Sequence, residues 1–167
     1  ILRLKEVYPN FKITCYTIPF PEALLLPANR SHLKVDKMKK WAKIVNAWDW
    51  MEIAIHGFYH EQFEADRSYD NFVILLKAAE NYLKEIGLNY VKIFKAPYWQ
   101  YSYDGLNVLK ENGYIVALDR NKPIAVPDGL KTYYYDWSVE EPMPNEDIVR
   151  GHSHTISRGV ANGLDRC

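Results

Sequence analysis

The feature that most constrains the fold of this chain is the alternation of strand-like and helix-like segments. Runs rich in β-branched and aromatic residues predict strands at 11–19, 51–55, 90–94 and 114–118, with two further candidates at 131–135 and 146–151. Apolar residues at helical spacing predict helices at 34–47, 71–86 and 103–112. Strands alternating with helices of about 10 to 16 residues are typical of an α/β fold with a parallel sheet, either a barrel or an open sheet.

Length and charge exclude several classes of protein. The chain has 167 residues, which suits a single domain over 1–167, and its 48% apolar share is enough for a sizeable core. Its 21 basic and 21 acidic residues balance, so composition gives no electrostatic case for binding nucleic acid or an anionic membrane. No apolar run approaches the roughly 20 residues of a membrane span, and no signal-peptide pattern is present. These features leave the oligomeric state and the compartment open, with the cytoplasm favoured.

Cysteine usage argues against a thiolate metal site. The two cysteines, Cys15 and Cys167, are too few for a disulfide framework. Cys15 lies in an apolar strand-like run, so we expect it to be a small buried hydrophobe.

Polar side chains follow the predicted strands at the point where each strand ends. These residues are His56, Lys95, Asp119 and Asp136, and His152 with His154 after the last candidate strand. In barrels and in open sheets alike, chemistry gathers at the carboxyl ends of parallel strands, so we expect one shared rim. Strands often end in polar residues, but the repetition favours an enzyme.

The pair His56 and His60 sets a geometric condition. In an extended chain, residues four apart are about 13 Å apart, too far to share an ion. In a helical turn their Cβ atoms are roughly 5 to 6 Å apart. A metal pair therefore requires the strand to end near Ile55 and one helical turn to follow, which Gly57 makes easy. The alternative is two partly exposed histidines on a loop.

A metal site also needs further groups. Zinc takes a third protein ligand and an open position for water. Glu61, Glu64 and Asp66 lie close in the sequence, but a local carboxylate of this kind is expected to be solvated. Position 57 is Gly rather than the Glu of the H-E-x-x-H metalloproteases, so a base must come from another strand.

A second histidine cluster lies in "GHSHT". His152 and His154 are two residues apart, so on a strand they point the same way. They are either part of a polar loop or a general acid/base, since imidazole titrates near neutral pH. His32 is expected to be a solvated loop residue.

Several segments of the chain resemble one known family, in the right order along most of its length. "EIAIHGFYH" resembles the second motif of the polysaccharide deacetylases, also called the NodB-homology family or carbohydrate esterase family 4. "FKAPYWQYSYDGLNVLKENGY" resembles the third motif, and "VYPNFKITCYTI" resembles the second strand of the family. "YYYDW" is similar to the Asp-Trp of the fourth motif, and "DIVRGHS" resembles the fifth.

This resemblance implies a fold, a reaction and roles for particular residues. The implied fold is a distorted NodB-like (β/α) barrel of about seven strands. Members of the family remove N- or O-acetyl groups from sugars, usually with zinc, and another divalent transition metal is an alternative. The resemblance assigns His56 and His60 to the metal, the backbone N–H of Tyr98 to the oxyanion, and His152 to the acid that protonates the leaving group. His154 is the alternative for that last role.

The resemblance also implies substrate contacts. Trp99, Tyr101 and Tyr103 follow the third motif and would form an apolar wall for sugar rings or for the acetyl methyl group. Asp136 and Trp137, which match the fourth motif, would also contact the substrate. The alternative for the aromatic residues is packing in the core or against a helix end.

Two departures from the family pattern bear on catalysis. The opening Asp-Asp motif lies on a strand before the helix that here begins at Ile1, and it is absent from this chain. We therefore expect either that the first strand is missing from this chain, or that the base and the carboxylate ligand are lacking. Lys95 replaces the arginine of the third motif, and the resemblance places it among the catalytic residues. It keeps the charge of the arginine without the bidentate geometry that would pair with a catalytic carboxylate.

The sequence therefore predicts a metal-dependent hydrolase that removes acetyl groups from an N- or O-acetylated glycan, with metal-bound water as the nucleophile. The alternative is a catalytically impaired deacetylase-like domain that binds a glycan or a partner, which the missing Asp-Asp motif and Lys95 favour. A metal hydrolase acting on another amide fits the same histidines.

Overall fold

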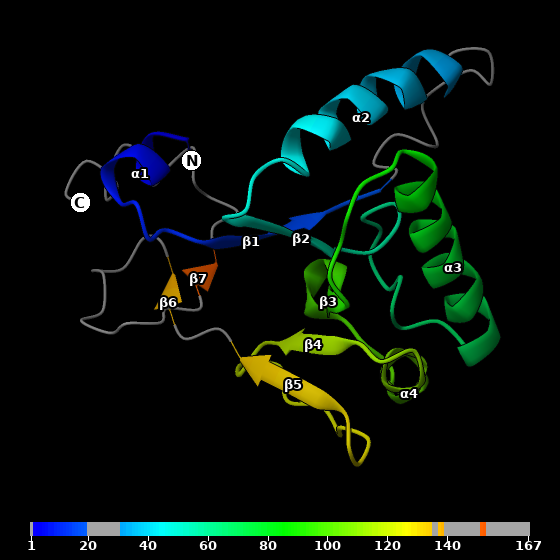
Figure 1. The fold of residues 1–167 in the computed structure, drawn as a ribbon. Helices are drawn as coiled ribbons and strands as arrows, with labels where there is room; N and C mark the ends of the chain where they lie inside the picture. Colours follow the sequence, from blue (N-terminus) through cyan, green and yellow to red (C-terminus); the bar gives the residue numbers. More distant parts are fainter. Residues whose placement is uncertain (1, 20–30, 135–136, 139–150, 153–167) are drawn as a thin grey trace.

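A five-stranded parallel sheet organises the chain, as seen in a computed structural model that describes residues 2–19, 31–134, 137–138 and 151–152 (Figure 1). The strands of this sheet are β1 Ile13–Thr17, β2 Met51–Ile55, β3 Ile93–Lys95, β4 Ile115–Leu118 and β5 Lys131–Tyr134. All four strand pairs are parallel, which confirms the predicted α/β class with a parallel sheet.

The strands lie in the sheet in the order in which they occur along the chain. A sheet that winds in one direction is typical of (β/α) barrels, whereas doubly wound sheets reverse their strand order at a switch point. Two further strands, β6 Trp137–Ser138 and β7 Gly151–His152, form a separate parallel pair. Closure into a barrel and a count of seven barrel strands stay predictions.

Helices connect most of the strands, as the sequence pattern predicts. Among the described residues they are α1 Leu2–Val7, α2 Ser31–Val45, α3 Tyr69–Glu85 and α4 Tyr103–Glu111, with a 3-10 turn, η2, at Pro97–Trp99. Helix α3 buries one face because its apolar residues recur at helical spacing. The link from β4 to β5 is a loop without a helix.

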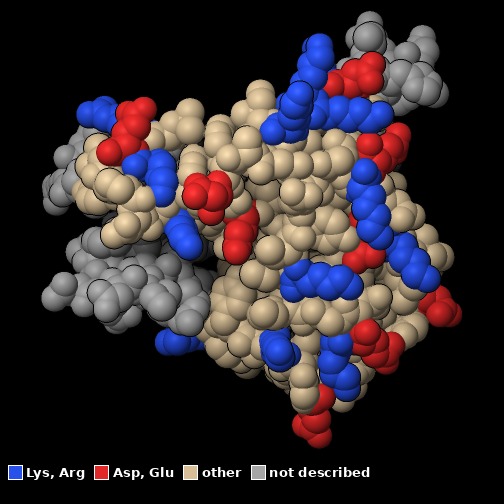
Figure 2. All heavy atoms as spheres, in the orientation of Figure 1, with Lys and Arg blue, Asp and Glu red and all other residues tan. Residues whose placement is uncertain are grey.

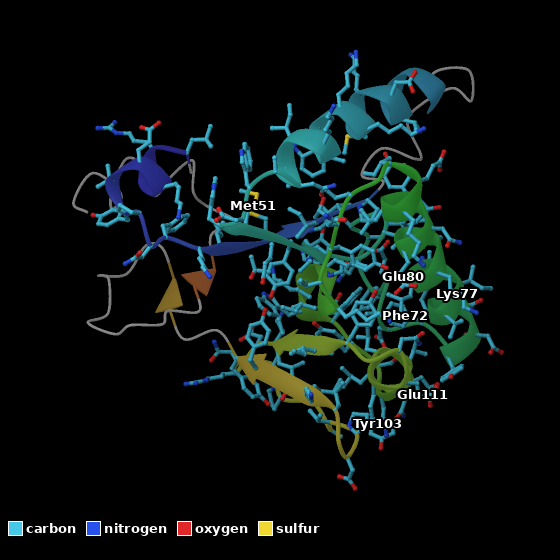
Figure 3. All side chains as sticks on the ribbon, viewed as in Figure 1. Met51, Phe72, Lys77, Glu80, Tyr103 and Glu111 are labelled. Atoms are coloured by element: carbon cyan, nitrogen blue, oxygen red, sulfur yellow. The ribbon has the colours of Figure 1, made fainter. Side chains whose placement is uncertain are left out.

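The core centres on Phe94 in β3. The Phe94 ring, 1% exposed, lies 5.6 Å from the Phe72 ring of α3, 6.4 Å from Tyr101 and 6.3 Å from Tyr114, measured between centroids. These edge-to-face contacts are the arrangement that aromatic quadrupoles favour. Figure 3 shows Phe72 between α3 and the sheet. The core therefore fixes β3 against helix α3 and against residues that flank α4, and β3 leads into the rim loop that carries the third motif.

The carboxyl ends of the strands are level with one another. Thr17 pairs with Ile55, Lys95 pairs with Ala117, and Leu118 pairs with Tyr134. The segments that follow these strands therefore leave the sheet at one edge, as expected from the polar residues at the strand ends.

The surface shows no dominant charge on the face drawn in Figure 2, where Lys and Arg are interspersed with Asp and Glu. None of the described helices has the length and hydropathy needed to cross a membrane. Cys15 was predicted to be buried, and this prediction was wrong. The residue packs against the core but is partly exposed on β1.

Candidate functional site

The two histidines of the second motif lie side by side at the end of β2. His56 is the first residue after the strand, and its backbone N–H donates to the carbonyl of Thr17 at 2.8 Å. The ring centroids of His56 and His60 are 4.9 Å apart with an interplanar angle of 67°. The predicted strand end at Ile55 is confirmed, and the two imidazoles are close enough to approach one ion.

The predicted helical turn between them was wrong. Residues 56–60 form bends without helix, with Gly57 at φ 73° and His60 at φ 64°. Left-handed backbone is easy for glycine and costs a β-carbon residue about 1 to 3 kcal/mol. The sharp reversal made by these two residues brings the rings together in place of a helix.

A buried carboxylate supports this reversal. Glu64 is 1% exposed, and its carboxylate accepts the backbone N–H of Tyr59 at 2.6 Å and that of Phe58 at 3.1 Å. Burial raises the pKa of Glu64, and the hydrogen bonds from the two amides oppose that rise. The expectation that Glu64 is solvated was therefore wrong, and sequence reasoning missed its role in the loop.

His56 has a defined tautomer. Its Nδ1 lies 2.7 Å from the backbone carbonyl of Lys95. Because a carbonyl can only accept, Nδ1 carries the hydrogen and donates, and in the neutral ring Nε2 carries the lone pair. Metal-binding histidines are usually held in this way, with the other ring nitrogen donating to a carbonyl or a carboxylate.

His60 is favoured in its neutral form. Burial lowers the pKa of His60, and the positive charge of Lys95 lowers it further. Neutral imidazole is the form that binds a metal ion, so the local electrostatics match the chemistry of a ligand.

Lys95 lies beside the pair, at the end of β3. Its ammonium nitrogen is 4.4 Å from the centroid of the Trp99 ring and 5.9 Å from that of Tyr16, both within the range of cation–π contacts. Burial lowers the pKa of Lys95 to about 8. The hydroxyl of Tyr16 is buried and has no hydrogen-bond partner among the described residues, so a water or ligand atom would satisfy it.

The third motif forms a strained turn next to His60. Tyr98 and Trp99 have φ values of 56° and 61°, and the Tyr98 ring lies 5.3 Å from the His60 ring. The Tyr98 side chain is 51% exposed, and its backbone carbonyl accepts from the Lys122 ammonium at 2.7 Å. Strained backbone of this kind clusters at functional sites, although it does not by itself define one.

Tyr101, predicted to contact the substrate, makes its described contacts with the sheet. It is 8% exposed, and its hydroxyl donates to the Ala117 carbonyl and accepts the Ala96 N–H. Trp99 is only partly buried, and Lys95 covers one face of its ring. Of these two residues, Trp99 is therefore the one that lies at the rim. The contact of either residue with a sugar stays a prediction.

The remaining predicted residues are described in part or not at all. His152 and Trp137 are placed as backbone, because β7 pairs with β6 and Ser138 lies opposite His152. Asp136 and His154 lie outside the described residues. The roles assigned to these four residues stay predictions.

The histidine pair does not complete a metal site within the part of the chain that is described. No group of three or more His, Cys, Asp and Glu side chains there is arranged to hold an ion. Two histidines with a suitable tautomer and a suitable charge state fit part of a zinc ligand set, which in catalytic sites has three protein ligands.

Comparison with known proteins gives a fold. No family model matches the chain, and no curated protein matches it significantly in sequence. Among solved structures, "putative polysaccharide deacetylase from Mycobacterium smegmatis" matches with a TM-score of 0.59 and 17% identity, over 96% of this chain and 54% of that chain. The chain thus spans about half the length of that protein. The likeness supports the predicted deacetylase-like fold.

Two other solved structures match less well. The 4-alpha-glucanotransferase from Thermococcus litoralis has a TM-score of 0.46 and 18% identity, over 71% of this chain and 18% of that chain. The Xyl-CE4 domain of a multidomain xylanase from the hindgut metagenome of Trinervitermes trinervoides has a TM-score of 0.45 and 18% identity, over 70% of this chain and 48% of that chain.

Proposed function

We propose that this chain is a metal-dependent hydrolase that removes acetyl groups from an N- or O-acetylated glycan. The observation that carries the proposal is the His56–His60 pair at the carboxyl end of β2, with a 4.9 Å separation between ring centroids. The hydrogen bond from His56 Nδ1 to Lys95 and the lowered pKa of His60 support it, because both leave a neutral imidazole nitrogen for an ion.

His56 and His60 would hold zinc or another divalent transition metal. Such an ion, when bound, supplies a Lewis acid for the acetyl carbonyl and a water of lowered pKa. The Tyr16 ring lies 5.9 Å from the Lys95 ammonium, and its buried hydroxyl has no hydrogen-bond partner among the described residues. A water or a ligand atom bound beside the pair would satisfy this hydroxyl. Among the described residues, His56 and His60 would be the two protein ligands of this ion.

The other residues of the rim would bind and orient the substrate. The backbone N–H of Tyr98 would donate to the oxygen that becomes negative as the acetyl carbonyl is attacked. Lys95 would keep a positive charge beside the pair, and Trp99 would offer an apolar surface to the sugar or to the acetyl methyl group. His152, or His154, would give a proton to the leaving amine or hydroxyl.

The experiment measures metal content and acetate release on the full chain. After removal of loosely bound ions, we expect near-stoichiometric zinc or another transition metal in the wild type, and its loss in the double variant His56→Ala with His60→Ala. His32→Ala is the matched control, because it removes a histidine from α2 and should leave the metal content unchanged.

Acetate release separates the possible reactions. N-acetylated chitooligosaccharides and O-acetylated xylan are the substrates, and release from either one should disappear with the metal. A full metal content with no acetate from any acetylated glycan would overturn the deacetylase proposal and favour a hydrolase of another amide. A folded chain without metal that still binds glycans would instead support the catalytically impaired binding domain.

A further inference from the structure

We infer that Glu64 is the positioning residue of the His56–His60 pair: its buried carboxylate fixes the loop that sets the distance between the two rings. This inference rests on the proposed metal site. Glu64 acts through the backbone, because its carboxylate oxygens accept hydrogen bonds from amide groups of the loop.

The contacts of Glu64 fall on the loop between the two histidines. Phe58 and Tyr59 are two of the three residues between the histidines, and both donate their backbone N–H to Glu64, at 3.1 Å and 2.6 Å respectively. A loop inside a protein must find partners for its amide hydrogens. Here one side chain binds two consecutive donors, so the path from His56 to His60 is fixed from within the same loop.

The carboxylate of Glu64 is deeply buried. Glu64 is 1% exposed, and together with core residues that include Phe72, Leu76 and Phe94 it lines a void of only about 10 Å³. Water has little room to replace the carboxylate there. Removal of its acceptor oxygens would leave two amides without a good partner, and the loop would have to open to hydrate them.

The carboxylate of Glu64 packs closely against Gly57. A β-carbon at position 57 would stand 2.0 Å from Glu64 Oε2 and 2.7 Å from Pro97 Cγ. The carboxylate therefore occupies the space that only a glycine leaves open. Through Pro97 the same packing reaches the turn that carries Tyr98, whose ring lies 5.3 Å from His60.

The backbone of His60 is strained, with a φ of 64°. A non-glycine residue holds such a conformation only when its surroundings impose it. The hydrogen bonds that the Glu64 carboxylate accepts from Phe58 and Tyr59, the two residues just before His60, supply that constraint. Without them, His60 is expected to relax and its ring to move away from His56.

The test uses the full chain with Co²⁺ as the probe, because Co²⁺ reports both affinity and coordination geometry through its visible absorption. Glu64→Gln keeps the size of the side chain but replaces one acceptor oxygen with a donor group. We expect Co²⁺ to bind at least about ten-fold more weakly, the size of effect seen when a group that orients a ligand is removed. The absorption spectrum of the remaining complex should also change.

Glu61→Gln is the matched control. Glu61 lies in the same loop, but its described contact is a partly exposed ion pair with Arg67 at 3.2 Å. Co²⁺ affinity and spectrum should be unchanged in this variant. A Glu64→Gln protein that binds Co²⁺ as the wild type does, with the same spectrum, would overturn the inference and leave the proposed function intact.

The wild type and a Glu64→Asp variant complete the test. If the wild type itself binds no Co²⁺, the proposed metal site fails and the inference fails with it. If Glu64→Gln does not fold, as judged by circular dichroism, Glu64→Asp decides the matter, because it keeps both oxygens and the charge but shortens the reach. Wild-type affinity and spectrum in a folded Glu64→Asp variant would contradict a role that depends on the position of the carboxylate.

Discussion

The hydroxyl of Tyr101 donates a 2.6 Å hydrogen bond to the backbone carbonyl of Ala117, which joins the third-motif segment to strand β4. The same hydroxyl accepts the backbone N–H of Ala96 at 2.8 Å, directly after β3. One phenol thus bridges the ends of two neighbouring strands at the level where the turn of Tyr98 begins. Burial raises the pKa of Tyr101, so the hydroxyl keeps its hydrogen and can donate.

Removal of this hydroxyl should destabilise the fold. Tyr101→Phe keeps the ring in the core but leaves a buried carbonyl and a buried amide without their partner. Unsatisfied groups of this kind cost about 1 to 3 kcal/mol, and a loss of that size is expected in urea unfolding. Tyr103→Phe is the control, because Tyr103 is 52% exposed and its change should stay within about 0.5 kcal/mol. Equal stability of the two variants would contradict the bridging role.

Gly105 gives a second prediction, because it lies against the backbone of Ala65. A β-carbon at position 105 would be 2.2 Å from the carbonyl oxygen of Ala65. In an open helix, Gly→Ala stabilises by about 1 kcal/mol. Here the opposing atom is backbone and cannot swing aside, so Gly105→Ala should instead destabilise by about 1 to 3 kcal/mol in urea unfolding.

The control for this substitution is Asn107→Ala, in the same helix α4. This change adds an alanine to the helix without the contact with Ala65, so it should be neutral or slightly stabilising. A stabilised Gly105→Ala variant would show that the segment around Ala65 can move away from α4. That segment also accepts the backbone N–H of Ser102 at 3.0 Å, through the carbonyl of Ala65.

Periodicity predicted the regular elements because they depend on side-chain patterns that repeat. Strand β2 was predicted at 51–55 and is found at Met51–Ile55, and α4 was predicted at 103–112 and is found at Tyr103–Glu111. The start of α2 at Ser31 was missed, because residues 31–33 carry no apolar repeat, and His32 therefore lies in this helix and not in the predicted loop. The turn η2 was also missed, since its left-handed residues, Tyr98 and Trp99, are types that rarely adopt such backbone.

The adjacency of His56 and His60 was predicted from the sequence, but the backbone geometry that produces it was not. The spacing of His56 and His60 predicted adjacency through a helical turn, and adjacency is found with a glycine bend in its place. Glu64 was missed because a local carboxylate is usually solvated. An account of where the loop amides find acceptors would have pointed to a nearby carboxylate, since these donors must be bound by something. The burial of Tyr101 depends on tertiary packing that no local pattern encodes.

Lys95 gives a prediction about pH, measured on the metal-free chain. Burial lowers its pKa from 10.5 to about 8 in the folded protein. Below about pH 8 both the folded and the unfolded chain hold the proton, and the cost of burying the charge is fully present. Between about pH 8 and pH 10.5 only the unfolded chain holds it, so this group makes stability rise with pH. Lys95→Met removes the contribution.

The quantity to measure is the difference in unfolding free energy between Lys95→Met and the wild type, from urea titrations between about pH 7 and pH 10. The absolute sign at pH 7 depends also on the lost contact with Trp99, but the trend does not. We expect the advantage of the methionine variant to shrink as pH rises, because the wild type alone gains stability over this interval. Lys77→Met, at an exposed position on α3, serves as the control and should differ from the wild type by a constant amount. A constant difference for Lys95→Met as well would mean that the Lys95 ammonium is as well solvated in the folded chain as in the unfolded one.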